Sequence, residues 1–234
     1  VHEQEAILLT YKVYTVVNLR QLYGKRPDLK GFHTQEVELP QQKTFTLEHY
    51  EGRNYNTTVW SQYVLFPQQT GKLEIPSITF DGVVAQQTIS DDPFDAFFNG
   101  GGYVEVKKKI TTPKVVINVQ LLPAKPAGFS GAVGELKLAS SINATDVKTN
   151  DAVTIKLTLS GTGNMKLIGT PEVKFPQDFE IYDPKVTDDY KLTNSGLTGT
   201  KTFEYLAIPR HAGNFTIPAI EFTYFDLKSN SYKT

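Results

Sequence analysis

The chain contains no cysteine, so disulfide bonds and cysteine-ligated metals are excluded. No apolar run approaches the roughly 18 residues of a membrane helix. The formal net charge is −1, whereas nucleic-acid binding needs a basic face that displaces phosphate counterions. The one basic cluster, residues 107–109, is best explained as a solvated edge strand, because lysine discourages pairing between sheet edges. We therefore expect neither a disulfide framework nor a nucleic-acid partner.

Motifs for catalysis and metal binding are also missing. There is no cysteine nucleophile, Gly-x-Ser-x-Gly elbow, phosphate loop or zinc motif. None of the four histidines pairs with another at metal-ligand spacing: His2, His33, His49 and His211. Three close carboxylates, Asp91, Asp92 and Asp95, could ligate calcium. Their spacing is not that of an EF-hand, and Asp92-Pro93 more simply starts a turn. We predict no catalytic residue, no cofactor site and no metal site.

The residues that are abundant favour β-structure. Aromatic residues make up 12 % of the chain, and threonine, valine and isoleucine are common beside them. Such side chains suit a pleated, half-buried surface. The length of 234 residues suits two domains of roughly 100–120 residues.

One stretch occurs twice. Residues 63–80 return as 205–222 in a shared frame of Tyr, three residues, Pro, three residues, Gly, three residues, Ile-Pro, one residue, Ile, one residue and Phe. A second match joins the alternating apolar residues of 7–13 to those of 153–159, a period of two that is typical of strands. The sequence therefore predicts two copies of one unit.

The repeated frame has a physical interpretation. Tyr63 and Tyr205 are expected on strands that end at Pro67 and Pro209, since proline cannot donate to a ladder. Gly71 and Gly213 are expected to turn the chain with positive φ. The return strands are expected to begin at Ile75-Pro76 and Ile217-Pro218. The tyrosine either packs in the core or donates its hydroxyl to the backbone at a corner, as in some immunoglobulin-like domains.

We predict an all-β chain of two tandem immunoglobulin-like β-sandwich domains, residues 1–122 and 123–234. The boundary lies in the proline-containing segment 121–128, because proline stiffens a chain without joining a sheet. The second unit has no counterpart of residues 115–119. We therefore expect its last strand to be missing from this sequence.

The first unit carries an insertion near residues 90–103 that the second lacks. Its phenylalanines either fold onto the sandwich or form an exposed apolar patch that docks a partner. Loops on a rigid scaffold often carry binding. The candidate partner-binding residues are Phe94, Asp95, Phe97, Phe98 and Tyr103.

Several pieces resemble one family. They lie at residues 92–98, 122–134, 160–164 and 205–218, and together they resemble the BatD family of the Bacteroides aerotolerance operon. The resemblance implies tandem immunoglobulin-like domains on the periplasmic side of the inner membrane, anchored by a helix outside this sequence. It also implies von Willebrand A-domain and MoxR-type ATPase partners and a role in oxygen or stress tolerance. No catalytic residue belongs to the family pattern.

The leading hypothesis is thus a non-enzymatic protein-interaction module. The alternative is a carbohydrate-binding or adhesin-like surface module. A flat exposed platform of Trp60 and tyrosine rings would favour sugar binding. Burial of Phe94, Phe97 and Phe98 within the domain would remove the docking role of the insertion.

Overall fold

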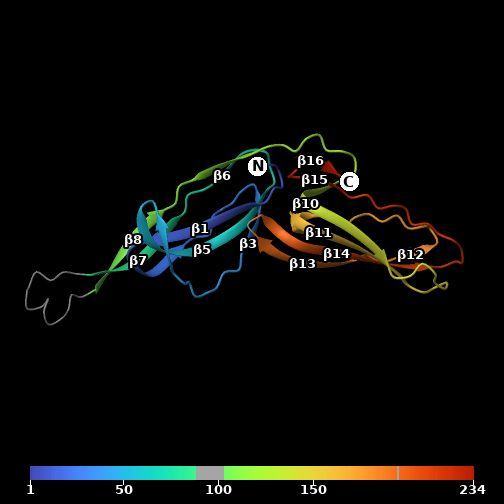
Figure 1. Ribbon diagram of the computed structural model, residues 1–234, viewed down its shortest axis with the longest axis horizontal. Coiled ribbons are helices and arrows are strands. Elements are labelled where there is room, and N and C mark those ends of the chain that lie inside the picture. The colour runs from blue at the N-terminus through green and yellow to red at the C-terminus, as the bar shows by residue number, and fades with distance from the viewer. Residues whose placement is uncertain (88–102, 194) are drawn as a thin grey trace, which may run out of the picture.

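A computed structural model of the chain describes residues 1–87, 103–193 and 195–234 (Figure 1). These residues form sixteen strands and one short 3₁₀ turn, η1 (Met165–Leu167), which confirms the all-β class. In the described ranges, no helix is long and apolar enough to cross a membrane. Two groups of strands lie at opposite ends of Figure 1, and both termini lie near its middle, where the groups meet.

The N-terminal half, residues 1–120, contains three sheets. In the first, β5 (Arg53–Pro67) lies between β1 (Ile7–Thr15) on one side and β3 (Phe32–Glu36) and β4 (Thr46–Tyr50) on the other. The second has the order β2 (Asn18–Gly24), β7 (Thr79–Gln87), β8 (Tyr103–Thr111). The third pairs β6 (Gly71–Ile75) with β9 (Val115–Val119). A core of Tyr11, Tyr63, Leu65, Ile75, Ile78 and Phe80 joins them.

The C-terminal half, residues 129–234, is one continuous sheet system. Its order is β12 (Phe179–Ile181), β14 (Gly196–Pro209), β11 (Val153–Gly163), β10 (Phe129–Ile142), β15 (Thr223–Asp226), β16 (Ser231–Lys233), and β13 (Lys185–Thr193) also pairs with β14. Its inner core contains Ile155, Leu157, Phe203 and Tyr205. Several sheets around such cores are consistent with immunoglobulin-like sandwiches. The limits 1–122 and 123–234 stay a prediction.

The repeat extends to strand register. Leu9 lies opposite Tyr63, and Ile155 lies opposite Tyr205. Because both pairs occupy corresponding positions of the repeat, β1 corresponds to β11, and β5 corresponds to β14. The alternation predicted for both stretches is confirmed, since Val153, Ile155, Leu157 and Leu159 are all buried, and Ile7, Leu9 and Tyr11 pack in one core.

The two copies differ at a β-bulge. Tyr11 lies opposite Ser61, but Lys12 lies opposite Val59, so Trp60 is an extra residue in β5. The corresponding pairs in the other half, Leu157 with Phe203 and Thr158 with Thr202, run without interruption. The bulge re-aims Trp60 onto Phe80, with ring centroids 4.6 Å apart and planes at 88°.

The repeated turn is only partly as predicted. Pro67 and Pro209 end β5 and β14, and Gly71 has φ +97°. Gly213 is not in the left-handed region, so the prediction for it was wrong.

The return strands also differ from the prediction. β6 begins at Gly71 and ends at Ile75, so Ile75-Pro76 closes a strand instead of opening one. Residues 210–222 contain no strand. The physical reason is the availability of a partner, because β6 pairs with β9, whereas no described residue pairs with 214–217.

The two repeated tyrosines behave differently. The Tyr205 hydroxyl donates to the backbone carbonyl of Pro171, 34 residues earlier, and burial raises the pKa of Tyr205 to about 12. Tyr63 instead packs edge-on against Tyr11, with ring centroids 6.3 Å apart. Of the two roles considered for this tyrosine, Tyr63 shows core packing and Tyr205 shows the hydroxyl bond to the backbone. The Tyr205 bond does not close a local corner.

Candidate functional site

Most of the predicted partner-binding loop lies outside the described residues. This applies to Phe94, Asp95, Phe97 and Phe98, and to the calcium alternative at Asp91, Asp92 and Asp95. Tyr103 is described: it opens β8 opposite Gln87 and is 68 % exposed. Lys107, Lys108 and Lys109 follow on the same edge strand with exposed side chains, as predicted. The docking role of the loop stays a prediction.

The histidines are dispersed. His2 lies 3.4 Å from Glu5, His33 packs on Phe66, His49 bonds Asn54, and His211 lies 3.1 Å from Asp178. Within the described residues, no group of three His, Cys, Asp or Glu side chains could hold a metal ion.

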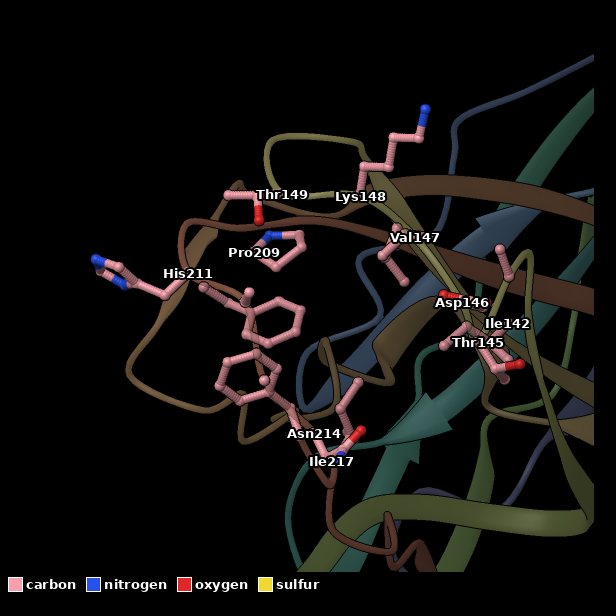
Figure 2. A pocket seen from close by; sticks show the side chains of 16 residues that line it. Ile142, Thr145, Asp146, Val147, Lys148, Thr149, Pro209, His211, Asn214 and Ile217 are labelled. Atoms are coloured by element: carbon pink, nitrogen blue, oxygen red, sulfur yellow. The ribbon is translucent and has the colours of Figure 1, made fainter.

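A hollow lies at the far end of the C-terminal half, and we call it the loop-end hollow. It has a volume of about 780 Å³ between residues 142–149 and 209–217 (Figure 2). Its floor is apolar, with the side chains of Val147, Val153, Phe179, Phe215 and Ile217. Lys148 and His211 point away from it in Figure 2. Two loops that are far apart in sequence thus enclose one hollow with both apolar and polar groups.

Two aromatic rings shape this floor. Phe179 and Phe215 meet edge-to-face with centroids 5.2 Å apart. A Cβ atom at Gly213 would come within 3.2 Å of the Phe215 ring. Gly213 therefore gives this ring room, a role that differs from the turn predicted for it.

A polar clamp ties the walls of the hollow together. The Arg210 Nε–H donates to Glu180 at 2.8 Å, and its Nη1–H donates to Asn150 at 2.7 Å. The backbone N–H of Arg210 donates to the Asp178 carbonyl at 2.8 Å. The Tyr182 hydroxyl, donating at 2.6 Å, and the Arg210 guanidinium hold the pKa of Glu180 below its usual range. The clamp joins β12, the end of β14 and the loop before β11.

Polar side chains also surround the hollow. Thr145, Asp146, Thr149 and Asn214 supply hydroxyl, carboxylate and amide groups around it. Among the described contacts, its titratable side chains Asp146, Lys148 and His211 form no hydrogen bond with one another.

A second, smaller hollow lies in the N-terminal half, and we call it the edge groove. Its volume is about 300 Å³. Residues 9–14 of β1 form one wall, and Ile110, Thr112, Pro113 and Val115 form the other. Leu22, Trp60, Ile75 and Phe80 complete the lining. No sequence pattern had indicated this groove.

The two halves meet at an apolar junction. Val64 and Phe66 lie on the face of β5 opposite its own core and are fully buried. They pack in one cluster with C-terminal residues such as Leu159, Met165 and Leu197. The corresponding positions of β14, Leu206 and Ile208, are not buried. One copy of the repeat therefore uses its outer face as an interdomain contact.

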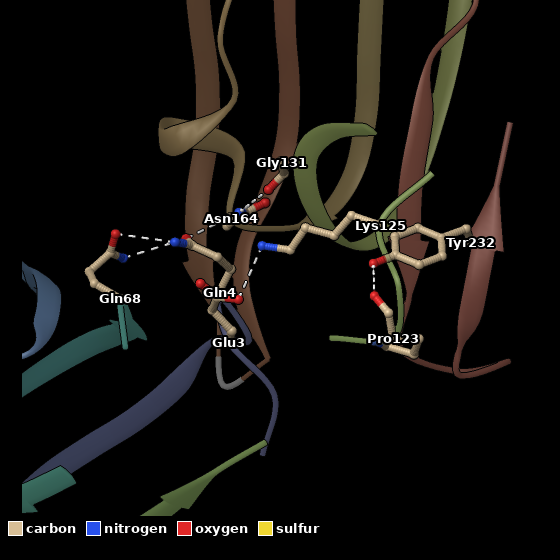
Figure 3. A network of polar contacts seen from close by, with 8 residues as sticks. All are labelled: Glu3, Gln4, Gln68, Pro123, Lys125, Gly131, Asn164 and Tyr232. Atoms are coloured by element: carbon tan, nitrogen blue, oxygen red, sulfur yellow. Dashed lines mark hydrogen bonds and ion pairs between the residues drawn. The ribbon is translucent and has the colours of Figure 1, made fainter. Parts of the chain in front are cut away.

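Polar contacts surround this junction (Figure 3). The Gln4 amide donates to Gln68 at 3.1 Å, and its Oε1 lies 3.5 Å from Nδ2 of Asn164. Lys125 Nζ lies 3.3 Å from Glu3. The Tyr232 hydroxyl donates to the Pro123 carbonyl at 2.8 Å, which holds the connecting segment against β16.

Asn164 is a structural residue that sequence reasoning missed. It is completely buried, its Nδ2 donates to the Gly131 carbonyl at 2.9 Å, and its Oδ1 accepts the Val133 N–H at 2.9 Å. Gly134 and Gly163 pair nearby, and a Cβ atom on Gly163 would lie 2.3 Å from the Val133 carbonyl oxygen. The pieces 129–134 and 160–164 had served only to mark a resemblance. In the structure, these two pieces form the end of the C-terminal half that meets the N-terminal half.

A family model described as the BatD DUF11-like domain matches residues 1–119 and 140–234. No curated protein matches the chain. No solved structure matches it either.

Proposed function

The chain belongs to the BatD family, and on this premise we propose that it is a non-enzymatic protein-interaction module. The observation that carries the proposal is the loop-end hollow, which combines an apolar floor, a polar rim and clamped walls. Such loops on a fixed scaffold commonly carry binding residues. A preformed apolar hollow also limits the ordering cost of association.

The partners in this proposal are von Willebrand A-domain proteins, which act with a MoxR-type ATPase. The protein would work on the periplasmic side of the inner membrane, anchored by a helix outside this sequence. Its biological role would be tolerance of oxygen or envelope stress. These assignments are supported by the family resemblance.

The carbohydrate-binding alternative is less well supported. Trp60 is only partly exposed and stands edge-on to Phe80. The exposed rings of Tyr14 and Tyr50 are tilted by 45°. Sugar stacking favours a flat aromatic platform, and the described residues do not form one at these positions.

Binding of the purified chain to a von Willebrand A-domain protein from the same operon tests the proposal. We expect Phe215→Asp and the rim variant Asn214→Arg to raise the Kd at least tenfold, because a central aromatic anchor commonly contributes about 1.4 kcal/mol or more. Leu47→Asp is the matched control, since Leu47 is 71 % exposed on β4, outside the hollow. Circular dichroism verifies folding of each variant.

Two results would contradict the proposal in different ways. Unchanged affinity of both hollow variants would remove the loop-end hollow as the site. Absence of any binding by the unaltered chain would remove the von Willebrand A-domain partner.

A further inference from the structure

The apolar cluster at the junction is also one end of the C-terminal core. Most of its buried members belong to the C-terminal half: Ala132, Leu136, Leu159, Met165, Ile168, Leu197 and Phe222. The other two, Val64 and Phe66, come from β5 and are fully buried. Two side chains of the N-terminal half thus complete the core of the other half.

This dependence is not mutual. The N-terminal core contains only residues between 7 and 117, and Tyr63 and Leu65 contribute to it from the opposite face of β5. Separating the halves would expose core side chains of the C-terminal half, such as Leu159 and Met165, but only an outer strand face of the N-terminal half. Exposing buried apolar surface to water is unfavourable. Separation should therefore destabilise the C-terminal half more than the N-terminal half.

The halves also touch at points beside this cluster. A Cβ atom at Gly196, the first residue of β14, would lie 2.7 Å from the Cβ of Ala6, so glycine permits close approach of the two halves. The His2 ring packs on the fully buried Phe225 ring, with centroids 5.4 Å apart. Contacts at separate points oppose pivoting of one half about any one of them.

The segment that connects the halves is fixed as well. Leu122 is 3 % exposed and packs with Val133 and Phe225 in a small apolar cluster. The next residue, Pro123, accepts the Tyr232 hydroxyl bond (Figure 3). Hinges between domains are a few loop residues that are free to change φ and ψ. A connecting segment with a buried side chain lacks this freedom.

We propose that the N-terminal half is a built-in stabilising partner of the C-terminal half: Val64 and Phe66 close the C-terminal core, and the two halves keep one fixed orientation. The two repeats are then one unit and not two independent domains, although tandem domains commonly move relative to each other. The junction also fixes the direction in which the loop-end hollow faces. The inference does not depend on the function proposed for that hollow.

Hydrogen exchange of the full chain, followed by mass spectrometry, tests the dependence. We expect Val64→Asp to speed exchange of the β10 and β11 amides at least tenfold, and that of the β2, β7 and β8 amides less than twofold. Leu206→Asp is the matched control, because Leu206 occupies the corresponding position of the repeat and is 37 % exposed. It should change exchange less than twofold outside β14. Unchanged exchange of β10 and β11 in Val64→Asp, or faster exchange confined to the N-terminal half, would overturn the proposal.

Val64→Thr is a milder variant that tests the same dependence if aspartate unfolds the entire chain. Threonine keeps the shape of valine and adds one hydroxyl group to the junction. As urea is added, amides of the C-terminal half should lose protection before those of the N-terminal half. Simultaneous loss in both halves, or earlier loss in the N-terminal half, would overturn the proposal.

The fixed orientation has a test of its own. Because the chain contains no cysteine, pairs of spin labels can be placed at introduced cysteines alone. Leu47→Cys with Val186→Cys spans the junction, and Leu47→Cys with Ile110→Cys lies within the N-terminal half; all three side chains are exposed. Double electron–electron resonance should give equally narrow distance distributions for both pairs, and Val64→Asp should broaden only that of the spanning pair. A broad distribution for the spanning pair without Val64→Asp would overturn the fixed orientation.

Discussion

The repeated stretch forms different structures in its two copies. In the N-terminal half, Gly71 has φ +97° and the following residues form β6, which pairs with β9. In the C-terminal half, residues 210–222 contain no strand, and residues 211–215 and 217 instead border the loop-end hollow. Both copies end the preceding strand at proline. The difference indicates that a strand forms only where a neighbour satisfies its backbone N–H and C=O groups.

The outer faces of β5 and β14 provide a second comparison. Val64 and Phe66 are fully buried at the junction, whereas the corresponding Leu206 is 37 % exposed and Ile208 is half-buried. The side chains at these positions are similarly apolar. Their different burial follows from which face meets the other half.

The largest expected effect tests this difference in burial. Phe66→Ala should lower the free energy of unfolding by about 3–5 kcal/mol, because it leaves a cavity in the junction. Ile208→Ala is the matched variant and should cost about 1 kcal/mol, since only part of that side chain leaves water. Urea unfolding measures both. Equal losses of unfolding free energy for the two variants would show that burial in the junction adds no more stability than partial burial on β14.

A smaller effect concerns the terminal hairpin. Asp226, on β15, is buried; its Oδ1 accepts the N–H groups of Lys228 and Ser229 at 2.8 and 3.1 Å, and Lys233 bonds its Oδ2. Val84 occupies the corresponding place in β7 and has no such role. Asp226→Ala should therefore cost about 1–3 kcal/mol at pH 7.

The same carboxylate makes stability depend on pH. The Lys233 ammonium holds the pKa of Asp226 below its usual value. Between the folded and the unfolded pKa of this carboxyl, the folded state therefore binds fewer protons than the unfolded state. This stabilisation is present above pH about 4 and is lost as the pH falls through the folded pKa. Urea unfolding at pH 7 and pH 3 should show a smaller difference between Asp226→Ala and the unaltered chain at pH 3. An undiminished difference would contradict the ion pair.

Local patterns were enough to predict the all-β class and the paired strands. The alternating residues of 153–159 appear as a buried face because a strand's period depends only on neighbouring positions. The burial of Val64 and Phe66 was not predictable in this way, because it depends on contact with the other half. The bulge at Trp60 shifts register by one residue without a distinct local pattern.

The candidate sites were harder to predict for the same reason. The loop-end hollow joins two loops that are far apart in sequence, and the edge groove lies beside an edge of β1 that pairs with no described strand. Tyr103 is exposed at the start of β8, and the docking role predicted for it and its loop stays a prediction, because the other loop residues lie outside the described ranges. Neither Asn164 nor Tyr11 belonged to a chemical motif.

The two repeated glycines should differ in their tolerance of a side chain. Gly71→Ala should cost about 1–2 kcal/mol, because an L-residue is strained at φ +97° although the space around it is open. Gly213→Ala should cost about 0.5 kcal/mol or less, because its φ is ordinary and only the Phe215 ring must shift. Thermal unfolding of both variants measures the difference. A larger loss for Gly213→Ala than for Gly71→Ala would contradict the assignment of the positive-φ turn to Gly71.

The smallest expected effect separates the two repeated tyrosines. Tyr205→Phe removes the hydroxyl bond to the Pro171 carbonyl and should cost about 0.5–1.5 kcal/mol at pH 7. Because burial raises the pKa of Tyr205 to about 12 from an ordinary value near 10, its neutral form is favoured in the folded state. That stabilisation is fully present below pH 10 and is lost as the pH rises towards 12.

Tyr63→Phe is the matched control for this last effect. The Tyr63 ring packs on Tyr11, and the described hydrogen bonds include none with its hydroxyl, so the substitution should change stability by less than about 0.5 kcal/mol. Urea unfolding between pH 7 and pH 12 compares the two variants with the unaltered chain. The deficit of Tyr205→Phe should shrink above pH 10, whereas Tyr63→Phe should follow the unaltered chain more closely. Equal deficits at every pH would show that the two tyrosines have the same role, since only the Tyr205 bond distinguishes them.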